Sequence, residues 1–283
     1  MIKRDIYSHS KLSTFEQCPL KYKYRYIDKI KPEFEASIET HLGKCVHDTL
    51  EWIYNLVLEG KIPPTIDGVI EYYGNRWIEE FKEETKIVKR EFDQKDYFNK
   101  GVIFLTNYYV KHHPFVDGTI ECEKKILINL KNYQIQGFID RLVQNKEKDE
   151  YEIHDYKTAN NLPTKEKIET DRQLALYSIA IKELFGEDKR ICLTWHYLAH
   201  NTKICIYKTP EQIEKLKKEI IQLIQRIEST NTFPHNQSIL CQWCEYKYAC
   251  PAFGNRPPEK QATLFGFKGK NSETSPEELD IWN

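Results

Sequence analysis

Two aspartates and a lysine, Asp140, Asp155 and Lys157, flank the charged loop 144–150 in segments whose residue pattern predicts two strands. The loop is centred near residue 147, so an antiparallel hairpin would place Asp140 opposite His154 or Asp155, with Cβ atoms about 5 Å apart. Asp155 and Lys157 are two residues apart and therefore share one face of their strand. Two carboxylates this close repel each other unless a cation lies between them, and Mg²⁺ prefers such oxygen ligands.

A lysine beside a bound metal ion can position or deprotonate a water molecule and can stabilise charge on a phosphate. The set therefore suits hydrolysis of a phosphodiester bond. The alternative is an ordinary salt bridge at a strand end between Lys157 and a carboxylate, because the Asp-x-Lys pattern is very short.

The sequence GFID at 137–140, followed after 14 residues by DYKT at 155–158, resembles the PD-(D/E)xK nuclease superfamily and its RecB-like branch in particular. The resemblance implies that Asp140, Asp155 and Lys157 are catalytic. It also implies that the two aspartates hold one or two Mg²⁺ or Mn²⁺ ions, to which the backbone carbonyl of Tyr156 could add a ligand. Asp155 stands where many relatives have glutamate, and its shorter side chain changes reach but not chemistry.

Two further motifs of this branch have counterparts on segments that read as helices. GKCVH at 43–47 supplies His47, which the resemblance makes a metal ligand. RQLALYSIA supplies Gln173 and Tyr177, one helical turn apart, which the resemblance assigns to holding the lysine and the DNA. Alone, His47 would be an ordinary helix histidine, and Gln173 and Tyr177 an ordinary helix face.

Three cysteines, Cys241, Cys244 and Cys250, follow the spacing C-x2-C-x5-C and lack a fourth ligand nearby. RecB-like nucleases of the AddB type and the CRISPR-associated adaptation nucleases, which this chain resembles, carry an iron–sulfur cluster with one N-terminal ligand. Cys18 matches that position. Four thiolates fit either Zn²⁺ or [4Fe–4S], and the resemblance favours the cluster. The other four cysteines are predicted to be ordinary buried thiols: Cys45, Cys122, Cys192 and Cys205.

Hydrophobic periodicity and turn residues predict the elements that carry these motifs. A first helix should start at a Ser10 cap and break near Pro19. Lys131-Asn132 is a plausible tight turn between two strands, and about five strands are expected in all. Further helices are expected at 42–58, about 68–86, 94–112, about 170–185, and from a Thr209/Gln212 capping box onward.

This order of elements indicates one α/β domain with a mixed sheet. The resemblance implies a restriction-endonuclease-like PD-(D/E)xK core, with a central mixed sheet flanked by helices and its two ends joined by the iron–sulfur cluster. The expected organisation is a nuclease domain over 1–253 and a mostly disordered tail over 254–283, where proline, glycine and charge replace core-forming residues.

Composition and charge indicate which binding partners and which cellular location to expect. The 283 residues carry a formal net charge of −1, so a role with nucleic acid would depend on local patches. One such patch is 21–31, KYKYRYIDKIK, although its tyrosines could equally face the core. There is no apolar run long enough to span a membrane and no apolar core of a signal peptide. We therefore expect a cytoplasmic, intracellular protein without a disulfide framework.

The tail contains the apolar stretch KQATLFGFK. Gln261, Leu264 and Phe267 match most of the peptide by which archaeal replication proteins bind a PCNA-type sliding clamp, with Lys268 in place of the second aromatic residue. The stretch also resembles the bacterial clamp pentapeptide, which would use Phe265. The alternative is a segment that folds back onto the nuclease domain.

The expected function is a metal-dependent DNA nuclease, most simply an exonuclease acting on single-stranded DNA ends in repair, recombination or replication. The sequence leaves two alternatives to this function open. One is a non-catalytic DNA-end-binding subunit whose iron–sulfur cluster is structural. The other is a CRISPR adaptation nuclease whose partner proteins set the cut.

Overall fold

The computed structural model describes residues 6–256, and the clamp-like residues Gln261, Leu264, Phe265 and Phe267 lie outside them. Within this range no helix is long and apolar enough to cross a membrane.

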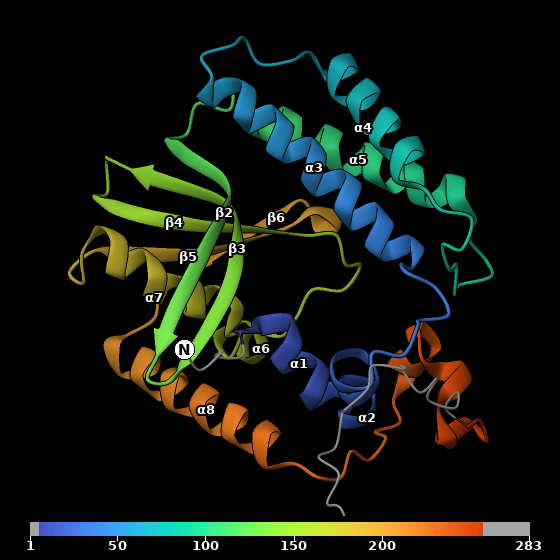
Figure 1. The fold of residues 1–283 in the computed structure, drawn as a ribbon. Coiled ribbons are helices and arrows are strands. Elements are labelled where there is room, and N and C mark those ends of the chain that lie inside the picture. Colours follow the sequence, from blue (N-terminus) through green and yellow to red (C-terminus); the bar gives the residue numbers. More distant parts are fainter. Residues whose placement is uncertain (1–5, 257–283) are drawn as a thin grey trace, which may run out of the picture.

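A mixed six-stranded sheet forms the centre of the described fold (Figure 1). Its path runs β1-β3-β4-β5-β6, and β2 pairs with β3. β1 is parallel to β3 and β4 is parallel to β5, whereas the remaining pairs are antiparallel. The strands are β1 Ile6–Ser8, β2 Thr119–Leu130, β3 Tyr133–Asn145, β4 Glu150–Lys157, β5 Arg190–Tyr197 and β6 Thr202–Ile206.

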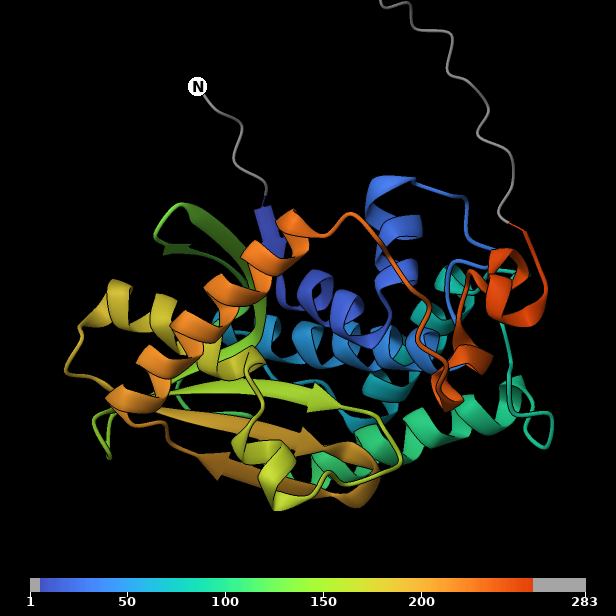
Figure 2. The same cartoon turned by 90° about the horizontal axis from the view of Figure 1, so that it is seen from below.

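Helices cover both faces of the sheet and divide the core in two (Figures 1 and 2). One core joins strand residues to α1, α7 and α8. The other joins α3, α4 and α5 to Tyr156 and Leu198. The helices are α1 His9–Gln17, α2 Pro19–Tyr22, α3 Ile38–Leu58, α4 Ile66–Glu80, α5 Gln94–His112, α6 Lys165–Glu169, α7 Gln173–Phe185 and α8 Pro210–Ser229. The α/β architecture with a mixed sheet flanked by helices is therefore confirmed.

Segments near the two ends of the described chain meet at α2, where the N-terminal helices and the last described turns lie next to each other in both views (Figures 1 and 2). The backbone N–H of Leu20 donates to the carbonyl of Pro234 at 3.2 Å. The Tyr24 hydroxyl donates to the carbonyl of Ala249 at 3.1 Å. Tyr24, Tyr246 and Ala249 form a small core of their own, so segments more than 200 residues apart share one packed unit.

Several predicted boundaries are correct and others shift. The helix over 94–112 and the Thr209/Gln212 capping box are confirmed. The first helix is capped by Ser8, whose hydroxyl accepts from the N–H of Lys11 at 3.1 Å. The helix expected at about 170–185 is α7, which starts at Gln173, where the Asp171 carboxylate accepts from the backbone N–H of Gln173; the separate short helix α6 ends before it, at Glu169.

The prediction of ordinary buried thiols is wrong for Cys192 and Cys205, which form a disulfide between β5 and β6 with 6.0 Å between Cα atoms. The register pairs Thr194 with Cys205, so Cys192 is the diagonal neighbour of Cys205 on the same face of the sheet. The Cys192–Cys205 pairing depends on the register of β5 and β6, which the spacing of the cysteines in the sequence does not give.

Candidate active site

The middle of β3 and the C-terminal end of β4 bring the two predicted carboxylates together. The antiparallel register pairs Arg141 with His154, and one further step places Asp140 opposite Asp155. Regular strand pairing stops there, since the Asp140 Oδ2 atom accepts from the backbone N–H of Tyr156 at 2.9 Å. The carboxylate thus takes a backbone donor at the strand end and is fixed in orientation.

His47 of α3 lies against the same carboxylate. Its Nε2 atom is 2.8 Å from the carbonyl oxygen of Tyr156, and its Nδ1 atom is 3.3 Å from Asp140 Oδ2. A neutral imidazole that donates Nε2–H to the carbonyl points the Nδ1 lone pair at a carboxylate oxygen. Two acceptors that face each other need a proton or a metal ion between them. The Tyr156 carbonyl, which the sequence predicts as a further ligand, is occupied here by His47.

Glu123 of β2 completes a cluster that the sequence analysis missed. One ligand atom from each of His47, Glu123 and Asp140 lies within 4.8 Å of the others. Glu123 has a φ of 45°, a backbone conformation that is costly outside glycine and is typical of functional sites. Counting outward from the Lys131-Asn132 turn pairs Asp140 with Glu123, so the predicted turn already contained the signal.

Burial and mutual repulsion raise the pKa values of these carboxyl groups. Burial, with a contribution from Asp155, raises the pKa of Asp140 to about 6 against the opposing effect of His47. Burial, and then the Asp140 charge, raise the pKa of Glu123 to about 7. Carboxyl groups held together at this energetic cost are expected where a cation is to be bound.

Lys157, Asp155 and Gln173 form a second group beside the first. The Lys157 ammonium lies 2.8 Å from Asp155 Oδ2 and donates to Gln173 Oε1 at 3.2 Å. Gln173 Nε2 in turn donates to Asp155 Oδ1 at 3.1 Å. Burial opposes the charge of the lysine, but Asp155 and other carboxylates prevail and raise the Lys157 pKa, so the amine stays protonated. The salt bridge between Lys157 and a carboxylate, which was the alternative to a catalytic role, is therefore present, and Gln173 joins it in a triad.

Tyr177 supports this triad from α7 and has a side chain that is only 6% exposed. Its hydroxyl contacts Gln173, and its ring packs on Gly137, where an added Cβ atom would lie 2.3 Å from the ring. The residue type at position 137 is therefore set by this close approach. The buried ring favours a role in holding Gln173 over a role in contacting DNA.

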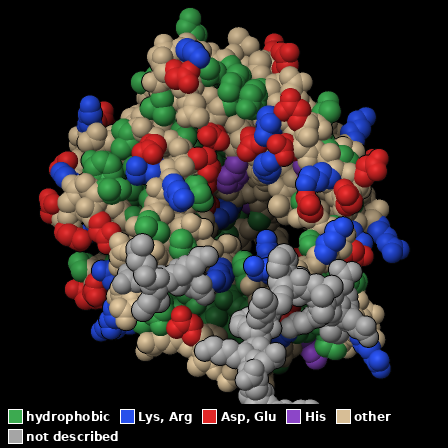
Figure 3. Space-filling model, viewed as in Figure 1, with side chains coloured by type: hydrophobic (Ala, Val, Ile, Leu, Met, Phe, Trp, Pro, Cys, Tyr) green, Lys and Arg blue, Asp and Glu red, His purple; other side chains and the backbone are tan. Residues whose placement is uncertain are grey.

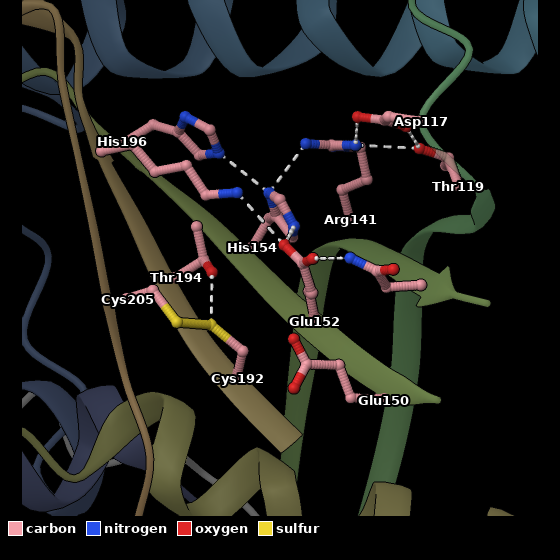
Figure 4. Close-up of polar contacts among 12 residues, drawn as sticks. Asp117, Thr119, Arg141, Glu150, Glu152, His154, Cys192, Thr194, His196 and Cys205 are labelled. Carbon is pink, nitrogen blue, oxygen red and sulfur yellow. Dashed lines mark hydrogen bonds and ion pairs between the residues drawn. A yellow bond between two sulfur atoms is a disulfide. The ribbon is translucent and has the colours of Figure 1, made fainter. Parts of the chain in front are cut away.

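A buried polar network lies under the strand ends (Figure 4). Arg141 is 1% exposed and donates through Nε to the Tyr156 hydroxyl at 2.9 Å. Its second terminal nitrogen is 2.7 Å from His154 Nδ1, and the guanidinium also pairs with Asp117. Burial and the nearby Arg141 charge lower the pKa of His154 to about 3, so the imidazole is neutral and accepts from Arg141. The network ties Tyr156, which contacts both Asp140 and His47, to the sheet.

The cysteines predicted as cluster ligands lie together at the junction of the two chain ends. Cys18, Cys241, Cys244 and Cys250 line one pocket. Two of the sulfur atoms accept backbone N–H groups, Cys18 Sγ at 3.5 Å and Cys241 Sγ at 3.4 Å. Among residues 6–256, the one group of three or more histidine, cysteine or acidic residues with ligand atoms within 4.8 Å of one another is His47, Glu123 and Asp140. The four cysteines do not form such a group.

Comparisons with known proteins find a matching family model and several similar solved structures. The model of the PD-(D/E)XK nuclease superfamily matches residues 6–251. No curated protein is found to match the chain. A solved structure of a "Putative exonuclease" from Eubacterium rectale has 11% sequence identity and a TM-score of 0.50, covering 83% of this chain and 86% of that one. The crystal structure of SSO0001 has 13% identity and a TM-score of 0.42, covering 89% and 88%.

Proposed function

The chain belongs to the PD-(D/E)XK nuclease superfamily, and from that premise we propose that it is a metal-dependent deoxyribonuclease acting as an exonuclease on single-stranded ends. One observation carries the proposal. His47, Glu123 and Asp140 place three ligand atoms within 4.8 Å of one another, next to a lysine ion-paired with Asp155.

The donor set fits Mg²⁺ or Mn²⁺. Two carboxylates and an imidazole are ligands that Mn²⁺ accepts, and carboxylates are those that Mg²⁺ prefers. The raised pKa values of Asp140 and Glu123 mean that a divalent ion relieves repulsion when it binds. When bound, the ion supplies Lewis-acid stabilisation of the phosphate under attack. Asp155, which follows opposite Asp140 in the strand register, would be a further ligand while it remains paired with Lys157.

Lys157 acts as a fixed positive charge. Its raised pKa makes it a poor general base, so it orients the attacking water and stabilises negative charge on the phosphoryl oxygens. Gln173 and Asp155 hold the ammonium by contacts of 3.2 and 2.8 Å. Because the lysine is already placed, little reorganisation is needed when charge develops in the transition state.

Cys18, Cys241, Cys244 and Cys250 are proposed to hold a [4Fe–4S] cluster. Their common pocket supports a shared four-thiolate site, and the resemblance to AddB-type nucleases favours a cluster over a single zinc ion there. Burial raises the pKa values of Cys244 and Cys250, to which other cysteines of the set contribute. A bound cluster would offset the cost of ionising four neighbouring thiols. Its role would be to join the two chain ends, since cluster binding and folding are linked.

The proposal is tested by a time course on single strands labelled at the 5′ or 3′ end, with Mg²⁺, Mn²⁺ or EDTA. We expect metal-dependent release of mononucleotides or short products, and the label that disappears first gives the polarity. Asp140→Ala should abolish release in either metal. Tight binding of DNA ends without cleavage in any metal would instead support the non-catalytic end-binding alternative.

A further inference from the structure

The part of the β2–β3 hairpin between Glu123 and the turn at 131–132 continues the face that carries the proposed metal ligands. The register pairs Lys125 with Phe138 and Leu127 with Gln136. Side chains alternate along a strand, so Phe138 shares a face of β3 with Asp140, and Lys125 shares a face of β2 with Glu123. A cation and an aromatic ring therefore occupy the cross-strand position next to the proposed metal site.

These side chains are exposed although the strands around them are buried. Phe138 is 48% exposed and Leu127 is 44% exposed, whereas Ile126 and Ile139, on the opposite face, are 3% and 0% exposed. In the space-filling view, this side of the molecule is hollowed near its centre, with histidine and charged side chains at the edge (Figure 3). Figure 1, drawn from the same side, shows β2 and β3 as the long hairpin of the sheet.

Within residues 6–256, neither an aromatic ring nor an acidic group pairs with these two side chains. Among the described residues, Phe138 makes no ring contact of the kind that joins Tyr151 to Phe185, and Lys125 forms no ion pair of the kind that joins Lys124 to Glu121. An exposed aromatic ring and an uncompensated cation side by side have the chemistry of a nucleotide contact, in which a base stacks on the ring and a phosphate meets the cation.

We propose that Phe138 and Lys125 form a subsite for the nucleotide adjacent to the scissile phosphate, and that this subsite selects single-stranded substrate. The inference rests on the proposed function. Two residues along a strand span about 6.7 Å, so Phe138 lies about one nucleotide from Asp140 along an extended strand. A base within a duplex is stacked on its neighbours and cannot cover the ring, whereas an unpaired base can.

The test measures binding and cleavage with the same full-length preparations. Fluorescence anisotropy with an oligothymidine strand and with a blunt duplex, in Ca²⁺ to support binding, gives the affinities. Phe138→Ala should bind the single strand roughly tenfold more weakly and the duplex almost unchanged. Phe138→Trp keeps an aromatic ring at this position and should bind the single strand with an affinity close to that of wild type. Ile103→Ala, at another exposed apolar position (55%), should have no effect.

A second measurement addresses the cation. Lys125→Gln should lower the slope of log affinity against log salt by about one, while Lys146→Gln, an exposed lysine at the distant β3–β4 turn, should leave it unchanged. A Phe138→Ala variant that binds the single strand as well as wild type overturns the subsite, and so does an equal loss for single strand and duplex. Cleavage of the single strand by wild type in Mg²⁺ tests the proposed function separately. If wild type cleaves but Phe138→Ala binds normally, only the subsite fails; if wild type does not cleave, the proposed function fails.

Discussion

Removing the charge of Asp140 should stabilise the metal-free protein while it destroys metal binding. The Asp140 side chain is only 13% exposed, and its pKa is raised from 3.8 to about 6 by burial, with Asp155 adding to the shift. The folded state therefore holds the Asp140 proton more tightly than the unfolded chain. This contribution to stability is complete below about pH 4 and is lost as pH rises through about 6.

The shift of about two units corresponds to about 3 kcal/mol of unfolding free energy, at 1.36 kcal/mol per unit. Asp140→Asn removes the charge and keeps an oxygen that can accept from the Tyr156 N–H. In EDTA at pH 8 we expect the variant to be more stable than wild type by up to about 3 kcal/mol, or roughly 5–10 °C in Tm. The difference should shrink towards zero at pH 4.

Urea unfolding of both proteins at pH 4, 6 and 8, with and without Mg²⁺, measures this effect. Mg²⁺ should raise the stability of wild type at pH 8 and leave Asp140→Asn unchanged. Asp149→Asn, at a carboxylate that is 85% exposed, serves as the matched control and should show no such pH-dependent gain. A variant that is no more stable than wild type at pH 8, or a difference that is independent of pH, would refute the reasoning.

Three further outcomes follow from the same contacts. Glu123→Gln should weaken Mn²⁺ binding about tenfold in calorimetry, and the loss should be larger at pH 8 than at pH 6, because the Glu123 pKa is about 7 and its charge is present only at the higher pH. Cys18→Ser should lose iron and visible absorption on anaerobic purification, whereas Cys45→Ser should keep both. Gly137→Ala should lower kcat and destabilise the protein by about 1–3 kcal/mol, since its Cβ would meet the Tyr177 ring.

The parts of the site that could be predicted are those fixed by short-range geometry. A short polar loop sets the β3–β4 register, so the proximity of Asp140 and Asp155 followed from counting residues. Gln173 and Tyr177 share a helix face because they are four residues apart, and the structure places Gln173 against Lys157 and Tyr177 against Gln173. These relations depend on chain spacing within one hairpin or one helix, which the sequence displays directly.

The parts that could not be predicted depend on irregular backbone or on long-range packing. Glu123 has a positive φ within β2, which no strand pattern predicts for glutamate, although its position opposite Asp140 follows from counting outward from the Lys131-Asn132 turn. β1 is three residues long and forms because it pairs with β3, more than 120 residues away. The same applies to Arg141, whose buried guanidinium is stabilised by groups from three distant segments, including Asp117 and Tyr108.

Lys157 is the residue through which cleavage and metal binding can be tested separately, because it is proposed to act in cleavage without being a metal ligand. Mn²⁺ binding by calorimetry and cleavage of a labelled single strand should be measured on the same preparations of wild type and Lys157→Ala. We predict that both proteins bind the metal and that the variant loses at least a hundredfold in kcat, as is typical when one preorganised charge is removed. A Lys157→Ala variant with near wild-type turnover would contradict the assignment of the active site.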